Sequence, residues 1–151
     1  MVLISNVNFS VIQRDEFEVC GGNYMSLEEK QNQIVANIET INEFLANSNC
    51  SDFMIANYNG CHLRLIGSFD LCYYSEIEIL FKEVSYISMY TYFGLWDLKQ
   101  KPFKVKFGTN DMDSLFEIHI GEDMDGKTHV IWCDSMQVYI GIQGLEESVF
   151  A

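Results

Sequence analysis

One segment of the chain spaces its apolar residues three or four positions apart, which is the repeat of an α-helix. The segment is SLEEKQNQIVANIETINEFLANSN, residues 26–49, and its apolar stripe consists of Ile34, Ile38, Ile41 and Leu45. Ser26 is a good N-cap, and Glu29 follows it at the spacing of a capping box. The sequence therefore predicts one amphipathic helix near residues 27–46, with its Asn, Gln and Glu side chains facing solvent.

After residue 53 the apolar residues recur at every second position, which is the repeat of a β-strand with one buried face. The clearest runs are EIEILF (76–81), FKVKF (103–107) and LFEIHI (115–120). This alternation sets Glu78 on the polar side of its strand and predicts that Phe107 faces inward.

Two stretches carry the turn residues of β-hairpins. Asn59-Gly60 lies between apolar runs and predicts a type I′ turn. Asp125-Gly126 predicts a second hairpin, with strands 114–120 and 128–134, in which Gly126 supplies the positive φ. In this second hairpin, His119 and His129 are expected near one another.

Together these elements predict an α+β fold that is rich in strands. No convincing helix follows residue 47, so the crossovers of a parallel sheet are missing. We expect an antiparallel sheet, a meander that is curled or sandwich-like, with the one helix covering one face or plugging one end. A chain of 151 residues with one proline and no Gly/Ser-rich linker fits a single globular domain, 1–151.

The composition excludes several classes of partner. Twenty-two acidic residues against nine basic residues give a net charge of −13, which opposes binding to nucleic acids and to anionic membranes. No apolar stretch approaches the ~20 residues that cross a bilayer, and the N-terminal residues lack the pattern of a secretory signal. The five scattered cysteines fit free thiols in a reducing compartment. We therefore expect a cytoplasmic protein.

The charges are distributed unevenly along the chain. Residues 107–151 contain nine acidic residues and one basic residue, Lys127, which gives this segment a charge of −8. Four of the nine basic residues lie close together, at Lys99, Lys101, Lys104 and Lys106. They form either a functional basic strip or the solvent side of one strand.

Residues 121–128, GEDMDGKT, match the P-loop pattern G-x-x-x-x-G-K-S/T. A P-loop requires a helix after the loop, whereas the following HVIWCDSMQVYI alternates like a strand. The carboxylates of the string would also repel a phosphate. DMDG is similar to the middle of an EF-hand loop, but Gly121 and Trp132 stand where acidic ligands are needed. We expect no nucleotide cofactor, and read the string as an acidic turn; a weak cation site is the alternative to a solvated loop.

Residues for metal binding or catalysis are sparse. The cysteines and histidines lack the paired spacing of zinc ligands, so no metal is expected. The one cluster that could provide a nucleophile and a base is Cys133-Asp134 with His119 or His129. A small enzyme using Cys133 is one hypothesis, against the simpler interpretation of a buried thiol.

An acidic and aromatic surface offers a different kind of function. The tyrosines of residues 73–96, together with Trp96, are too many for one buried face, so they either fill the rim of the core or contact a partner. The candidate partner-binding residues are Asp111, Asp113, Glu117, Glu122, Asp123, Asp125, Tyr73, Tyr74 and Trp96. We expect a protein-binding module with a basic partner, such as an immunity-type protein that neutralises a toxin, for example a nuclease. The alternative is a nucleic-acid mimic that inhibits a DNA- or RNA-binding enzyme.

Overall fold

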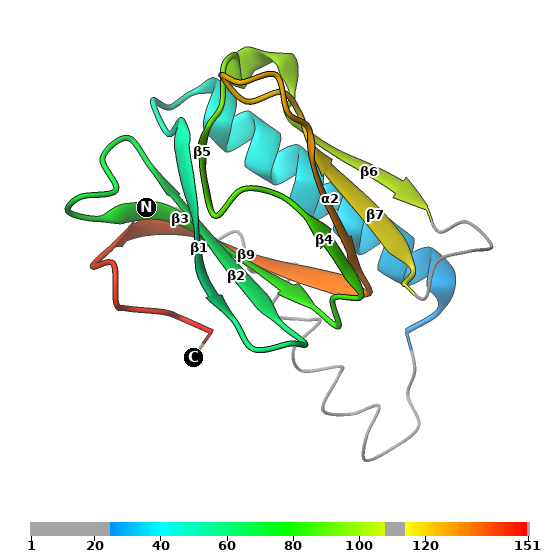
Figure 1. The fold of residues 1–151 in the computed structure, drawn as a ribbon. Helices are drawn as coiled ribbons and strands as arrows, with labels where there is room; N and C mark the ends of the chain where they lie inside the picture. The colour runs from blue at the N-terminus through cyan, green and yellow to red at the C-terminus, as the bar shows by residue number, and fades with distance from the viewer. Residues whose placement is uncertain (1–24, 108–113, 151) are drawn as a thin grey trace.

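Two antiparallel sheets and one long helix make up the part of the protein that the computed structural model describes, residues 25–107 and 114–150 (Figure 1). The five-stranded sheet has the order β5 (Tyr92–Gly94), β1 (Asp52–Tyr58), β2 (Leu63–Ser68), β3 (Ser75–Lys82) and β9 (Ser135–Gln143). The four-stranded sheet has the order β4 (Tyr86–Ser88), β8 (His129–Cys133), β7 (Phe116–Ile120) and β6 (Phe103–Phe107). The predicted α+β class with antiparallel strands is confirmed.

Helix α2 (Leu27–Ala46) forms where the apolar repeat predicts it. The Ser26 Oγ accepts a hydrogen bond from the Glu29 N–H at 3.1 Å, which satisfies one of the free amides of the first turn. The predicted apolar stripe is buried, as seen for Ile34, Ile38, Ile41 and Leu45. None of the helices within the described ranges combines the length and the apolar character needed to cross a membrane.

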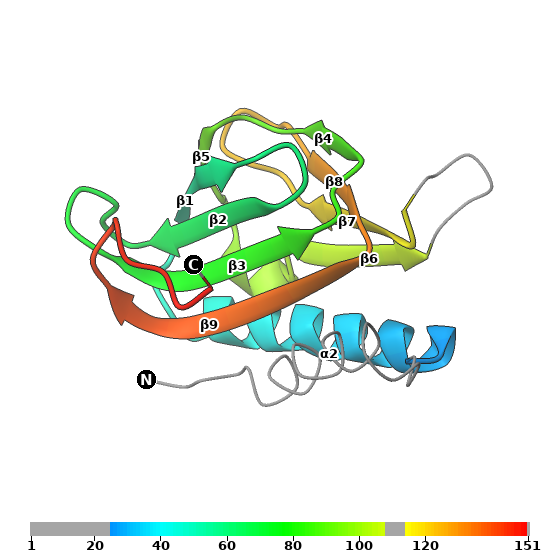
Figure 2. The ribbon, with the colours of Figure 1, turned by 90° about the horizontal axis from the view of Figure 1, so that it is seen from below.

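Two asparagines of α2 are buried, which corrects the expectation that its Asn side chains face solvent. The Asn42 side chain donates to the Phe103 carbonyl (2.8 Å) and accepts from the Phe103 N–H (3.0 Å). Asn37 donates to the Met136 carbonyl at 3.1 Å. Phe103 and Met136 belong to the edge strands β6 and β9, and Figure 2 shows α2 running alongside β9. The helix therefore binds the edges of both sheets through amide groups that replace a missing neighbouring strand.

The two sheets are joined by a bent pair of strands. The β3–β9 ladder ends at Lys82 and Ser135, and the Asp134 N–H then donates to the Lys82 carbonyl at 3.0 Å. Beyond the bend, the Ser85 N–H donates to the Trp132 carbonyl at 3.0 Å, where the β4–β8 ladder begins. These two hydrogen bonds connect the end of one sheet to the start of the other across the bend.

Aromatic rings fill the space between the sheets. Phe53 stacks on Phe93, with ring centroids 5.6 Å apart, and its ring also packs against Phe103 at 5.9 Å. Gly67 makes room for this packing, because a Cβ there would lie 2.6 Å from the Phe53 ring. At the far end of β6, Phe107 is 46% exposed, so the prediction that it faces the core is wrong. It lies at the end of an edge strand, where its ring meets Phe116 at 6.0 Å.

The hairpin at Asn59-Gly60 forms, but its turn is not of type I′. Gly60 has a φ of +88°, whereas Asn59 does not have the positive φ that type I′ requires. The strands end at Tyr58 and Leu63, which leaves a longer connection than the two residues of that turn. Instead, the Asn59 side-chain oxygen accepts hydrogen bonds from the N–H groups of Cys61 (2.9 Å) and His62 (2.7 Å).

Glu78 lies on the outer face of the five-stranded sheet, but it is fully buried rather than solvated. Its Oε2 accepts hydrogen bonds from Arg64 Nε (2.7 Å) and from Ser148 Oγ. Its Oε1 accepts hydrogen bonds from Gln143 Nε2 (3.2 Å) and the Val149 N–H (3.1 Å). A buried charge requires such partners, so Glu78 fixes the C-terminal segment across the sheet.

Candidate protein-binding surface

The string GEDMDGKT forms the loop between β7 and β8, as the predicted hairpin requires. Its central residue, Asp123, is buried, and its Oδ1 accepts hydrogen bonds from the N–H groups of Asp125 (2.8 Å) and Lys127 (3.0 Å). Gly126 has the predicted positive φ, at +81°. The loop amides that a P-loop would direct at phosphate are here bound to a carboxylate, and a strand follows the loop instead of a helix.

A buried histidine holds Asp123 from the other side. His129 Nδ1 accepts a hydrogen bond from the Tyr90 N–H at 3.2 Å, so the ring proton sits on Nε2 and is donated to Asp123 Oδ2 at 2.9 Å. The imidazole also stacks on Phe93, with centroids 4.0 Å apart. Burial lowers the pKa of His129 below its ordinary value, against the opposing effect of Asp123. The histidine is therefore a neutral, structural residue.

Hydrogen bonding keeps Asp123 ionised in this buried position. Burial by itself acts to raise the pKa of the carboxyl. The hydrogen bonds from Lys127, His129 and Asp125 outweigh burial, and they hold the pKa of Asp123 below its ordinary value. A charged Asp123 and a neutral His129 thus fix the loop as one rigid unit.

This acidic loop attaches to the outer edge of β5. Leu95 and Asp123 form an antiparallel bridge, and the Met124 N–H donates to the Gly94 carbonyl at 3.0 Å. The side chain of Met124 covers Gly94, since its Cε and Sδ lie 3.4 and 3.5 Å from the position that a Cβ on Gly94 would occupy. The loop therefore extends the five-stranded sheet at this edge.

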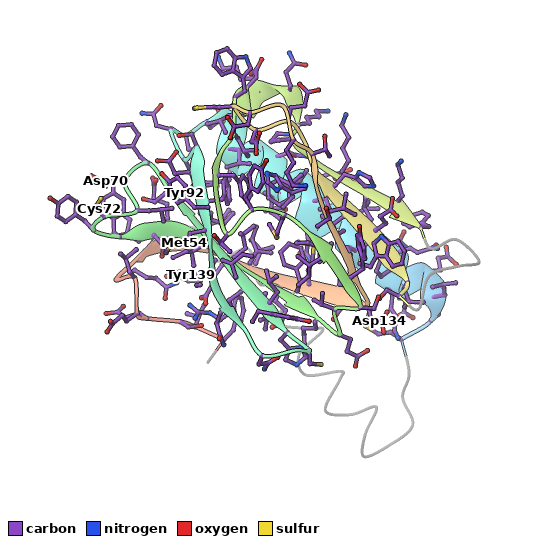
Figure 3. The ribbon with its side chains drawn as sticks, in the orientation of Figure 1. Met54, Asp70, Cys72, Tyr92, Asp134 and Tyr139 are labelled. Atoms are coloured by element: carbon purple, nitrogen blue, oxygen red, sulfur yellow. The ribbon has the colours of Figure 1, made fainter. Side chains whose placement is uncertain are left out.

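The antiparallel registers bring exposed apolar and acidic side chains together along β5. Trp96 and Glu122 directly adjoin the two residues of the isolated Leu95–Asp123 bridge, and both are exposed. On the other side of β5, Asp52 pairs with Gly94 and Met54 pairs with Tyr92. Met54 and Tyr92 lie close together in Figure 3. We call this region the β5 surface and define it by Asp52, Met54, Tyr92, Trp96, Asp97, Glu122, Met124 and Asp125.

Large apolar side chains at the centre of the β5 surface are open to solvent. Trp96 is 76% exposed, Met124 62% and Tyr92 55%. Partial desolvation raises the pKa of Tyr92, and the carboxylate of Asp52 on the neighbouring strand adds to this shift. Lys127 is turned away from this centre, because its Nζ hydrogen-bonds to Ser88 Oγ (3.3 Å) and lies 5.4 Å from the centroid of the Tyr90 ring.

The structure brings together three of the predicted partner-binding residues, Trp96, Glu122 and Asp125, all of them exposed. Asp123 is 4% exposed, so its carboxylate faces the protein interior and not a partner, which corrects its predicted place on the surface. Asp111 and Asp113 lie outside the described residues.

The remaining predicted residues lie on other elements than β5 and the acidic loop. Tyr73, 77% exposed, and the half-buried Tyr74 lie in the connection between β2 and β3. Glu117 lies on β7 and hydrogen-bonds to His119, which lowers the pKa of the Glu117 carboxyl. Tyr73 and Tyr74 were predicted from their aromatic rings and Glu117 from its charge, and the structure places them on different elements.

Five residues of the β5 surface were not among the predicted partner-binding residues: Asp52, Met54, Tyr92, Asp97 and Met124. The run of tyrosines and Phe near residue 92 was visible in the sequence, but it did not indicate which rings stay outside. Met124 is enclosed by acidic residues in the sequence, and that signal could have identified it as an exposed apolar side chain.

The residues proposed for catalysis do not form a catalytic cluster. The Cys133 thiol is fully buried, its register partner on β7 is Phe116, and burial raises its pKa well above the ordinary value. His119 pairs with Val130 while His129 pairs with Ile120, so the two imidazoles point to opposite faces, contrary to expectation. Within the described residues, no three His, Cys, Asp or Glu side chains gather as a metal site.

The four clustered lysines, Lys99, Lys101, Lys104 and Lys106, are all exposed. Lys104 and Lys106 lie on the outer face of β6, opposite His119 and Glu117. Since β6 is an edge strand, charged side chains of this kind protect it from pairing with another sheet.

Comparison with protein-family models, with curated proteins and with solved structures finds no match for this chain. Its function is therefore argued from the β5 surface.

Proposed function

We propose that this chain is a protein-binding module of the immunity type, which neutralises a toxin by covering a basic surface with its β5 surface. The observation that carries this proposal is the exposure of Trp96, Met124 and Tyr92 beside carboxylates on one edge of the sheet. Exposed aromatic side chains anchor protein interfaces, and methionine is also enriched there. Such side chains rarely gather on a surface without a partner.

The carboxylates around this centre set the charge of the partner. Asp97, Glu122 and Asp125 are exposed and belong to a chain of net charge −13. Complementary charge accelerates encounter and suppresses wrong partners. A nuclease toxin has a basic active site because it must hold phosphate, so it is a suitable target for an acidic inhibitor.

The rigidity of the acidic loop favours tight binding. Asp123 and His129 hold the loop from within, while Glu122, Met124 and Asp125 point outward. A surface that is already ordered loses little conformational entropy when a partner binds. The buried pair therefore supports the binding residues without contacting the partner.

The nucleic-acid mimic is less well supported by the same side chains. A mimic needs many free carboxylates, but Asp123 is buried, Glu117 hydrogen-bonds to His119, and Asp134 accepts the Leu115 N–H at 2.9 Å. Apolar anchors between the acids also favour a protein surface over phosphate mimicry.

The test measures binding to the toxin-like product of a neighbouring reading frame, and protection of cells that express it. Reversing two charges, Glu122→Lys with Asp125→Lys, should weaken binding roughly tenfold or more and abolish protection. The matched control is Glu39→Lys with Glu43→Lys, which makes the same charge change on the exposed face of α2. Equal binding by both double variants would refute the β5 surface as the binding site, and failure to bind any basic candidate would refute the proposed class.

A further inference from the structure

Trp96 and Glu122 offer an exposed ring and an exposed carboxylate on two neighbouring segments. They directly adjoin Leu95 and Asp123, which pair in an isolated antiparallel bridge and are themselves buried. Trp96 is among the most exposed large apolar side chains of the described residues, at 76%. An indole face that is this open attracts cations by its quadrupole.

From this pair we infer that the β5 surface receives arginine side chains of its partner, with one guanidinium stacked on Trp96 and bonded to Glu122. The inference rests on the proposed function and names the chemical group that the partner must present. We expect the exposed carboxylates of Asp97 and Asp125 to pair with further basic side chains of the partner.

Arginine fits this arrangement better than lysine for a geometrical reason. A guanidinium is planar, so it can stack on a ring while its edge donates two parallel hydrogen bonds to a carboxylate. An ammonium group is a compact and strongly hydrated charge, which pairs with the carboxylate or contacts the ring but gains less from both. The thioether of Met124, placed over Gly94, adds a polarizable contact for the arginine stem.

The protein already contains one contact of a cation with an aromatic ring. Lys127 Nζ lies 5.4 Å from the centroid of the Tyr90 ring, and its bond to Ser88 keeps it there. Because Lys127 is held in this way, its ammonium group does not pair with Glu122 or cover the Trp96 ring.

The experiment titrates the full chain with two amidated peptides of equal charge, hexa-arginine and hexa-lysine, and follows the indole N–H signals by NMR. The chain has two tryptophans, so the Trp132 signal serves as an internal reference. We expect hexa-arginine to shift the Trp96 signal with a Kd roughly two- to fivefold lower than that of hexa-lysine, the range of one exposed cation–π contact.

Two variants decide whether the preference comes from Trp96. Trp96→Leu should equalise the two peptides, whereas Tyr58→Leu, which removes an exposed ring at the opposite end of β1 from Asp52, should preserve the preference for arginine. Equal Kd values for the wild-type chain, or a preference that survives Trp96→Leu, would overturn the inference. Either result leaves the proposed function standing, because that function is judged by binding and protection with the toxin itself.

Discussion

A single buried carboxylate determines the shape of the acidic loop. Asp123 accepts hydrogen bonds from two loop amides and from His129. In Asp123→Ala these donors lose their partner inside the protein, and buried groups without partners are costly. We expect the variant to lose about 3 kcal/mol of unfolding free energy in a urea titration. Asp125→Ala, an exposed neighbour in the same loop, should change stability by less than about 0.5 kcal/mol.

The pair of Asp123 and His129 also makes the fold sensitive to acid. The folded protein lowers the pKa of His129 below the ordinary value of about 6.5, so it binds fewer protons than the unfolded chain in this range. The contribution of the neutral histidine to the free energy of unfolding is therefore fully present above about pH 6.5. It is lost as the pH falls below that value. The lowered pKa of Asp123 adds a further loss below about pH 4.

The test is thermal unfolding between pH 8 and pH 5. The melting temperature should fall in the acidic half of this range, and His129→Gln should flatten the dependence while lowering stability overall. His62→Gln, a half-buried histidine at the β1–β2 hairpin, is the control and should keep the dependence. A wild-type melting temperature that stays constant between pH 8 and pH 5 would contradict the lowered pKa of His129.

At the scale of elements, α2 connects the edges of the two sheets through hydrogen bonds of its buried asparagines. Asn42→Ala would leave the Phe103 N–H and carbonyl without partners in a buried position, so we expect a loss of about 2 kcal/mol of unfolding free energy. Asn32→Ala removes an exposed asparagine from the same helix and should be nearly neutral. Denaturant titrations of both variants test this. Similar free energies of unfolding would show that the hydrogen bonds between Asn42 and Phe103 contribute little.

The sequence predicted those elements whose signals are local. The apolar repeat and the capping box identified α2, and the alternation with Gly126 identified the β7–β8 hairpin. Asn42 and Glu78 were assigned to solvent because their partners are remote, 61 residues away for Asn42 and 65 to 71 residues away for the C-terminal partners of Glu78. No periodicity reports a contact at such a separation.

The same limit applies to the candidate site. Trp96, Glu122 and Asp125 were predicted from aromaticity and charge, which are properties of single residues. Their assembly into one surface depends on the Leu95–Asp123 bridge between distant parts of the chain. Tyr92 and Met124 join that surface only through these pairings, so the sequence alone could not place them in it.

At the scale of the molecule, the charge of −13 acts mainly on the rate of encounter with a basic partner. We expect the association rate constant to fall roughly tenfold or more as the salt concentration rises from about 50 mM to about 500 mM. The dissociation rate constant should change much less, because the apolar contacts of Trp96 and Met124 are not screened. Stopped-flow or surface binding kinetics would check this. An association rate constant that does not depend on salt would argue against a role of the carboxylates of the β5 surface in binding.

The attachment of the acidic loop to β5 has a consequence for self-association. An edge strand with free backbone groups is a template on which other chains can pair, and aggregates grow from such edges. The loop occupies the Gly94 end of β5 through the Met124 N–H, and it carries carboxylates that repel a second copy. Damage to this loop would therefore expose the aggregation-prone edge at the same moment that it disorders the binding surface. Loss of binding and loss of solubility should arise together in the same variants.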